Sequence, residues 1–258
     1  RNFASDDERN ICGRKLRYTC LMESLPNGSE RLKSPEEIKI PIEVQYSVDN
    51  EVSRIRRTID KYSWFIENGY KPRLPQAIKD RLENGDDISD DEIKSATEGE
   101  YQNEMYQAKA NEIRGAWEIE SGYFLEKLKT LGRPMVEQYT VFLTKYGTGG
   151  SYGYPNLVQL NLNNTSNRGV LYVTFHEMVH LTIQDLIEKY KIPHWTKERL
   201  VDLTMNNFFP DKKRSQRDPE NAEEISEIFK KEFPDIEKII AEISKPNAGM
   251  QVSSSTPR

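Results

Sequence analysis

The segment from residue 169 to residue 190 constrains the fold of this chain more than any other segment. Its apolar residues recur three or four positions apart, which is the spacing of neighbours on one face of an α-helix. The members of this apolar stripe are Tyr172, Phe175, Val179, Ile183 and Leu186. A helix of this kind is stable when its apolar face is covered. We therefore expect residues 169–190 to form an amphipathic helix whose stripe is buried.

The sequence predicts several further helices and one strand in addition to this segment. Ser89-Asp90-Asp91-Glu92 has the form of a capping box, and the chain that follows contains no Pro before Pro134, so a long helix or a helical pair should run to about Leu131. Alternating apolar residues predict an edge strand over 38–46, interrupted by Pro41. Helical spacing predicts the remaining helices over 52–66, 196–208 and 219–244.

Two more strands are expected over 136–144 and 157–162. The glycine-rich turn 147–150 lies between them, so we expect these strands to form an antiparallel hairpin. The expected fold class is α+β: mostly helical, with a helical N-terminal region and a small antiparallel-type sheet beside the 169–190 helix. Trp64 and Trp117 occupy apolar helical positions and are expected in the core.

Composition argues against several classes of partner. The 258 residues include 37 Lys and Arg against 42 Asp and Glu, and this net charge of −5 gives no overall attraction for nucleic acid. No apolar run approaches the about 18–20 residues of a membrane span, so none is expected. The basic cluster 212–217 is expected to be a solvated loop. We favour a cytoplasmic location and leave secretion open, because the chain begins at Arg1 without an initiator Met.

The 169–190 helix carries an HExxH motif, His176-Glu177-Met178-Val179-His180. His176 and His180 lie one turn apart on one face, so both imidazoles can reach a single Zn²⁺ at about 2.0–2.1 Å. Glu177 lies about 100° further round the helix and can approach a water molecule beside the metal. All three histidines of the chain fall between residues 176 and 194, which favours a metal site over scattered structural histidines.

A catalytic zinc site with two histidines needs a third protein ligand. The downstream candidates are Asp185, His194, Glu198 and Asp202. A helix that begins at Thr196 would place Glu198 in its first turn and Asp202 one turn later on the same face. We favour Glu198 as the third ligand, and Asp202 as the acceptor for the second ring nitrogen of a ligand histidine. His194, Asp202 and Asp185 remain alternatives to Glu198.

His176-Glu177-x-x-His180, seventeen intervening residues and Glu198-x-x-x-Asp202 together resemble the gluzincin metallopeptidases of the thermolysin-like class. This resemblance implies one Zn²⁺ per chain, held by the two histidines and Glu198, with Glu177 as general base and Asp202 orienting a ligand histidine. It implies an endopeptidase-like activity on a peptide or protein substrate. It also implies that the strand at 156–163 is an edge strand that pairs with the substrate.

Related families fit the sequence less well. No Gly-x-Met-Glu-Asn segment of the kind used by gluzincin aminopeptidases is present, so exopeptidase action is not expected. The metzincin pattern fails because Ile183 stands where that family has Gly and Leu186 stands where it has a third His. Tyr190, His194 and Tyr154 could each stabilise a developing oxyanion, although for each of them singly we favour a packed side chain at a helix joint.

The expected organisation is a loosely ordered arm over 1–34, a mainly helical region over 35–132, a zincin-like catalytic domain over 133–244 and a disordered tail over 245–258. The region 35–132 could select substrates or give structural support alone, and the oligomeric state is left open. The alternative to a zinc metallopeptidase is a catalytically silent zinc-binding interaction or scaffold protein.

Overall fold

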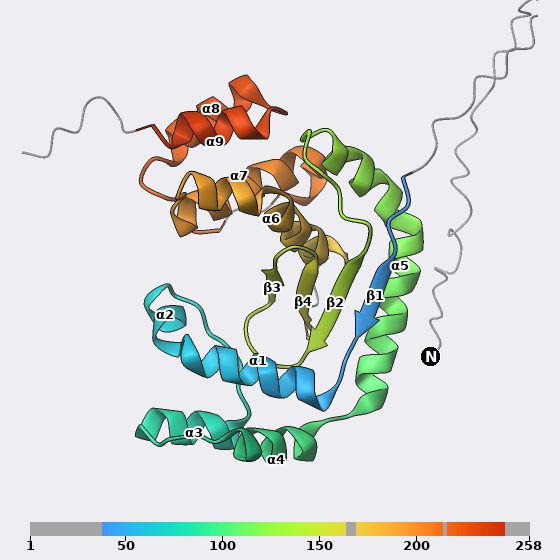
Figure 1. Ribbon diagram of the computed structural model, residues 1–258, viewed down its shortest axis with the longest axis vertical. Helices are drawn as coiled ribbons and strands as arrows, with labels where there is room; N and C mark the ends of the chain where they lie inside the picture. The colour runs from blue at the N-terminus through green and yellow to red at the C-terminus, as the bar shows by residue number, and fades with distance from the viewer. Residues whose placement is uncertain (1–37, 164–168, 214–215, 246–258) are drawn as a thin grey trace, which may run out of the picture. The chain divides into compact units, whose positions relative to one another are not determined.

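A four-stranded sheet with the order β1-β2-β4-β3 organises the computed structural model, which describes residues 38–163, 169–213 and 216–245 (Figure 1). β2 pairs in parallel with both β1 and β4, whereas β3 and β4 are antiparallel, so the sheet is mixed. The strands are β1 (Ile42–Gln45), β2 (Tyr139–Thr144), β3 (Gly150–Gly153) and β4 (Leu157–Asn161).

Helices make up most of the rest of the described chain (Figure 1). The prediction of a mostly helical α+β fold with a small sheet is therefore confirmed. The helices are α1 (Val48–Asp60), α2 (Tyr62–Glu67), α3 (Gln76–Asn84), α4 (Asp90–Glu100), α5 (Asn103–Lys129), α6 (Tyr172–Lys189), α7 (His194–Phe208), the short 3₁₀ helix η1 (Pro210–Lys212), α8 (Ala222–Glu232) and α9 (Ile236–Ile243).

The predicted antiparallel hairpin between 136–144 and 157–162 is wrong. The connection between β2 and β4 is long enough to hold a further strand, β3, which forms the antiparallel pair with β4. The chain then enters β4 in the same direction as β2, with Val141 opposite Val158. As a result the strand predicted at 156–163, which is β4, is an inner strand and not an edge strand. The edge on that side of the sheet is β3. The predicted edge position of β1 is confirmed.

Most helix predictions are confirmed, with differences at the boundaries. Ser89 and Glu92 form the predicted capping box at the start of α4, which is followed by α5 as a helical pair. The helix predicted over 52–66 is divided at Lys61 into α1 and α2. The helix predicted over 219–244 is divided near Pro234, which has no N–H to continue a helical ladder.

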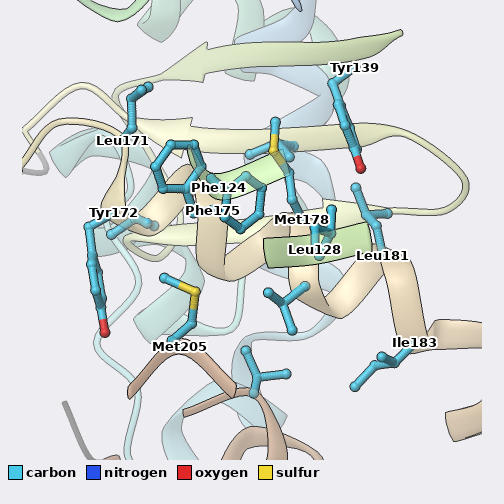
Figure 2. Close-up of a cluster of buried hydrophobic side chains, with 14 of the residues drawn as sticks. Phe124, Leu128, Tyr139, Leu171, Tyr172, Phe175, Met178, Leu181, Ile183 and Met205 are labelled. Carbon is cyan, nitrogen blue, oxygen red and sulfur yellow. The ribbon is translucent and has the colours of Figure 1, made fainter. Parts of the chain in front are cut away.

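The core lies between α5, α6 and the sheet (Figure 2). Every member of the predicted apolar stripe of α6 is buried, so this prediction is confirmed. Phe175 of α6 stacks on Phe124 of α5 with ring centroids 4.1 Å apart. On the other faces of α6, polar residues are buried as well, namely Thr174, His176, Glu177 and His180. The first half of α6, residues 172–181, is buried on all sides, so such polar side chains must be satisfied within the protein.

Trp117 lies in the core as predicted, and its Nε1 donates a hydrogen bond to the carbonyl oxygen of Ile40 at 3.0 Å. The same prediction is wrong for Trp64, which lies in the middle of α2 and is 40 % exposed. α2 is short and buries none of its residues, so an apolar residue on it is not drawn into the core.

Among the described helices, none is long and apolar enough to cross a membrane. The arm predicted over 1–34 lies outside the described residues, and so does the predicted tail apart from Lys245. The sheet takes β1 from the region predicted as N-terminal and its other strands from the region predicted as catalytic, so the two regions share the larger of the two hydrophobic clusters.

Candidate metal centre

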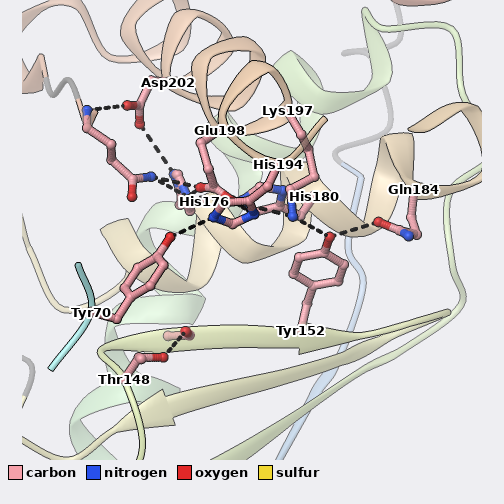
Figure 3. A network of polar contacts seen from close by, with 12 residues as sticks. Tyr70, Thr148, Tyr152, His176, His180, Gln184, His194, Lys197, Glu198 and Asp202 are labelled. Carbon is pink, nitrogen blue, oxygen red and sulfur yellow. Dashed lines mark hydrogen bonds and ion pairs between the residues drawn. The ribbon is translucent and has the colours of Figure 1, made fainter. Parts of the chain in front are cut away.

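α6 and α7 bring three buried side chains, His176, His180 and Glu198, to one point (Figure 3). The Nε2 atoms of His176 and His180 are 3.2 Å apart. Oε2 of Glu198 lies 3.6 Å from the first of these atoms and 3.3 Å from the second. Each of the three residues is at most 6 % exposed.

These separations match those that a tetrahedral metal ion requires. Two ligands that lie about 2.0–2.1 Å from a zinc ion at a tetrahedral angle are about 3.3 Å from each other. The observed separations of 3.2, 3.3 and 3.6 Å lie close to this value. The buried His-His-Glu group can therefore bind a metal ion, and its residues are those that the sequence predicted as ligands.

Three predicted residues lie one turn apart along one face of α7: His194, Glu198 and Asp202. The helix begins at His194 after Pro193, not at Thr196 as predicted, so Glu198 lies in the second turn and not in the first. The cause is local, because Pro193 cannot donate within a helix and is well placed just before its start.

Asp202 lies on the far side of His176 from the converging ligand atoms. Its Oδ1 is 3.8 Å from Nδ1 of His176, and its Oδ2 accepts a hydrogen bond from the backbone N–H of Gln216 at 2.7 Å. Carboxylates that face the second ring nitrogen of a ligand histidine commonly fix the orientation of the ring. This is the position expected for Asp202 from the sequence.

Tyr152 of β3 supports the second histidine. Its ring stacks on that of His180, with centroids 4.8 Å apart and planes inclined by 12°. The Tyr152 hydroxyl donates to Gln184 at 2.8 Å and accepts from Nζ of Lys197 at 3.0 Å. Lys197 also lies 3.3 Å from Oε1 of Glu198, so one cation connects β3 with the carboxylate of the centre.

Burial and neighbouring charges favour the protonation states that a metal needs. Burial lowers the pKa of His180 to about 3, despite the opposing effect of the Glu198 carboxylate, so the imidazole is neutral near pH 7. Burial alone would raise the pKa of Glu198. Hydrogen bonds with His176 and His180 and the charge of Lys197 outweigh that effect and hold the pKa below its usual value. Neutral imidazoles and a carboxylate are the metal-binding forms.

Glu177 faces a cavity of about 1010 Å³ that is also lined by the three ligand residues. Only 7 % of Glu177 is exposed, and its carboxylate packs against Gly150 of β3. A Cβ atom at position 150 would lie 2.5 Å from Oε1 of Glu177, so the close approach requires glycine. The carboxylate of Glu177 therefore lies in the cavity, next to the edge strand β3.

The structure places only one of the three predicted oxyanion-stabilising residues in this cavity. His194 lines it, and Nε2 of this residue is 2.9 Å from the hydroxyl of Tyr70. Tyr190 lies at the end of α6 and Tyr154 is 64 % exposed, and neither lines the cavity. Asp185, an alternative ligand, forms a salt bridge with Arg133 away from the centre.

Several residues that line the cavity were not predicted from the sequence. Tyr70 and Arg54 come from segments more than 100 residues before α6, and nothing in their local sequence marks them. Gln216 belongs to the cluster 212–217 that was expected to be a solvated loop, and that expectation is wrong for this residue. Its amide donates to Oε2 of Glu198 at 2.8 Å.

The chain matches no family model, no curated protein and no solved structure at a significant level. The conclusion that the geometry supports is a buried group of two histidines and one glutamate, able to bind one metal ion beside a large cavity.

Proposed function

We propose that this protein is a zinc-dependent metallopeptidase that hydrolyses peptide bonds within a chain. One observation carries the proposal: the ligand atoms of His176, His180 and Glu198 converge at tetrahedral spacing, with Glu177 beside them in the same cavity. Two imidazoles and one carboxylate form a ligand set that suits zinc and leaves room for a further ligand.

Glu177 is the general base in this proposal. When bound, the metal ion supplies a Lewis acid that polarises the carbonyl group of the scissile bond and lowers the pKa of water. Glu177 accepts a proton from the attacking water and delivers it to the leaving amine. The nearly complete burial of Glu177 restricts bulk water around its carboxylate and strengthens its interaction with the reacting groups.

The edge strand β3 supports a peptide as the substrate. Gly150, Ser151 and Tyr152 of this strand line the cavity beside the metal ligands. β3 pairs with β4 along one side and ends the described sheet on the other. An extended peptide can add to such an edge through main-chain hydrogen bonds, and would then pass directly in front of Glu177.

His194 and Tyr70 are candidates for stabilising the oxyanion. Both line the cavity, and the hydrogen bond between them fixes their orientation. Burial and the nearby charge of Lys197 lower the pKa of His194, although the Glu198 carboxylate opposes this effect. A neutral imidazole or phenol placed beside a developing negative charge stabilises it by hydrogen bonding.

The proposal is tested by comparing the zinc-loaded wild type with Glu177→Gln on a quenched-fluorescence peptide library. We expect hydrolysis by the wild type and a loss of about 10²–10⁴-fold in kcat for Glu177→Gln, because a positioned base contributes about that factor. Zinc content should be the same in both proteins, since Glu177 is not a ligand.

Glu188→Gln is the matched control, because Glu188 is exposed on the same helix, does not line the cavity, and uses its side chain to accept a hydrogen bond from Gln184. Its rate should equal that of the wild type. Full hydrolysis by Glu177→Gln would contradict the mechanism. Zinc binding without hydrolysis of any peptide would favour the silent scaffold instead.

A further inference from the structure

The wall of the cavity that faces the metal centre is formed by α1, α2 and the residues just after them, and it is rich in cations. Arg54, Arg57 and Lys61 all line the cavity on this side, with Asp60 as the only acidic residue among its α1 and α2 lining residues. Lys197 adds a further cation on the α7 side, where it is engaged with Glu198 and Tyr152. The cation-rich wall defined by Arg54, Arg57 and Lys61 is not used by the proposed hydrolytic steps.

Arg54 is the innermost of these cations, with an exposure of 6 %. Its hydrogen-bond partners are neutral: Nη1 donates to Oγ of Ser151 at 2.9 Å and to Oε1 of Gln159 at 3.1 Å, and Nη2 donates to Oγ1 of Thr148 at 3.3 Å. Within the described part of the chain, its Nε–H finds no hydrogen-bond partner. Of the residues that the structure describes, none forms an ion pair with Arg54.

A buried guanidinium without a paired carboxylate is costly, because removal of water from the charge is not offset. The pKa of Arg54 shows this cost of burial. Burial, together with repulsion from Arg57, lowers its pKa to about 10, and the more distant carboxylates of Glu177 and Glu51 compensate only in part. Arg54 remains charged near pH 7, and no carboxylate of the described residues pairs with it directly.

The position of Arg54 relates it to the reacting groups. Ser151, which accepts its hydrogen bond, lies on β3 between Gly150, which packs on Glu177, and Tyr152, which stacks on His180. A ligand group bound by Arg54 would therefore lie close to a peptide that runs along β3. The guanidinium recognises planar anions best, and the planar anion that a peptide offers is a carboxylate.

We propose that the cavity selects peptides that carry a carboxylate close to the scissile bond, which Arg54 binds while Arg57 and Lys61 attract it. This inference rests on the proposed peptidase function, since it assigns a substrate class to the same cavity. The carboxylate can be the side chain of Asp or Glu, or the C-terminus of a peptide that ends a few residues beyond the scissile bond.

The test uses the zinc-loaded protein with residues 1–258 and quenched-fluorescence peptides in which single positions are either Glu or Gln. Each peptide is made with a free and with an amidated C-terminus, which distinguishes the two sources of the carboxylate. We expect the wild type to favour Glu over Gln at one position, or the free acid over the amide, by about 10- to 100-fold in kcat/KM.

In Arg54→Gln this preference should fall to about threefold or less, mainly through a higher KM for the carboxylate peptide. Arg56→Gln is the matched control: the residue is on the same helix, but its guanidinium binds Asp90 and the carbonyl oxygen of Ile88 outside the cavity. It should keep the wild-type preference. A wild type with no preference, or an Arg54→Gln variant with an unchanged one, would overturn the proposal.

A second pair of variants covers the case that Arg54→Gln does not fold, and a binding measurement separates selectivity from hydrolysis. If Arg54→Gln does not fold, as judged by circular dichroism, the exposed pair Arg57→Gln and Lys61→Gln decides, with a reduced preference supporting the proposal and an unchanged one contradicting it. Binding to the Glu177→Gln variant, followed by tryptophan fluorescence, measures the same preference without turnover. Selective binding of carboxylate peptides in the absence of any hydrolysis would leave this inference standing while the peptidase proposal fails.

Discussion

Gly150 is the residue at which the edge strand comes closest to the proposed general base. A Cβ atom there would lie 2.5 Å from Oε1 of Glu177 and 2.6 Å from Cγ1 of Val173, so Gly150→Ala must displace the carboxylate. We expect kcat to fall by about 10- to 100-fold, because small errors in the position of a catalytic group are costly. Zinc content, measured by mass spectrometry, should not change.

Gly115→Ala serves as the control for this variant. Gly115 lies within α5, and a Cβ atom there would meet no other group within 4 Å. Alanine should raise the free energy of unfolding by about 0.5–1 kcal/mol and leave kcat unchanged. An active Gly150→Ala enzyme would show that Glu177 does not need its observed position.

The residues of the metal centre could be predicted because their spacing along the sequence places them on matching faces of two consecutive helices. His176 and His180 are four positions apart on one helix, and Glu198 begins a second turn of the next helix. Tyr70 and Arg54 could not be predicted, since each reaches the cavity through tertiary packing alone. The hydroxyl of Tyr70 meets a histidine that is 124 positions later in the chain.

At the scale of the elements, helices followed from the sequence better than strand pairing. The stripe of α6 and the capping box of α4 are properties of consecutive residues. The direction in which β2 meets β4 depends on the whole connection between them, including a short strand built around Gly150 and Gly153. Glycine-rich segments carry little β-propensity, so the sequence pattern there indicates a turn.

The capping box of α4 predicts a pH effect on stability. Hydrogen bonds from the backbone and side chain of Ser89, together with the charge of Arg81, lower the pKa of Glu92 below its reference value of 4.5. A carboxyl group with a lowered pKa in the folded state stabilises the fold above its unfolded pKa, and this contribution is lost as the pH falls through the folded value. The box therefore weakens below about pH 4.5.

Glu92→Gln tests this effect, because glutamine also serves in a capping box but does not titrate. We expect the unfolding midpoint in urea to fall less between about pH 6 and pH 3 in this variant than in the wild type. Glu98→Gln, at an exposed position on the same helix, should follow the wild type. Identical pH profiles for all three proteins would rule out the contribution of the box.

At the scale of the whole molecule, the metal centre depends on the N-terminal helices. Phe175 directly precedes the first histidine, and its ring stacks on that of Phe124. The ring centroids of Phe175 and Trp117 are 6.1 Å apart. β1 pairs with β2, and α1 and α2 supply one wall of the cavity. The N-terminal region therefore supports the core around the metal centre, and substrate selection by its α1 and α2 wall stays a prediction.

A chain that begins at residue 133 should therefore not fold by itself. It would expose the core face of α6 and leave β2 as an unpaired edge, which removes most of the apolar burial around Phe175. We expect no cooperative thermal transition and no ordered aromatic signal in the near-ultraviolet circular dichroism spectrum. A cooperative transition in this fragment would show that the N-terminal helices are dispensable for the fold.

Metal content tests the central claim most directly. The protein is purified without a metal-affinity resin and analysed by mass spectrometry, together with Glu198→Ala and the control Asp185→Asn, whose carboxylate binds Arg133 and not the centre. We expect about one zinc ion per chain in the wild type and the control, and little or none in Glu198→Ala. A wild type that binds no zinc even after reconstitution would contradict the claim.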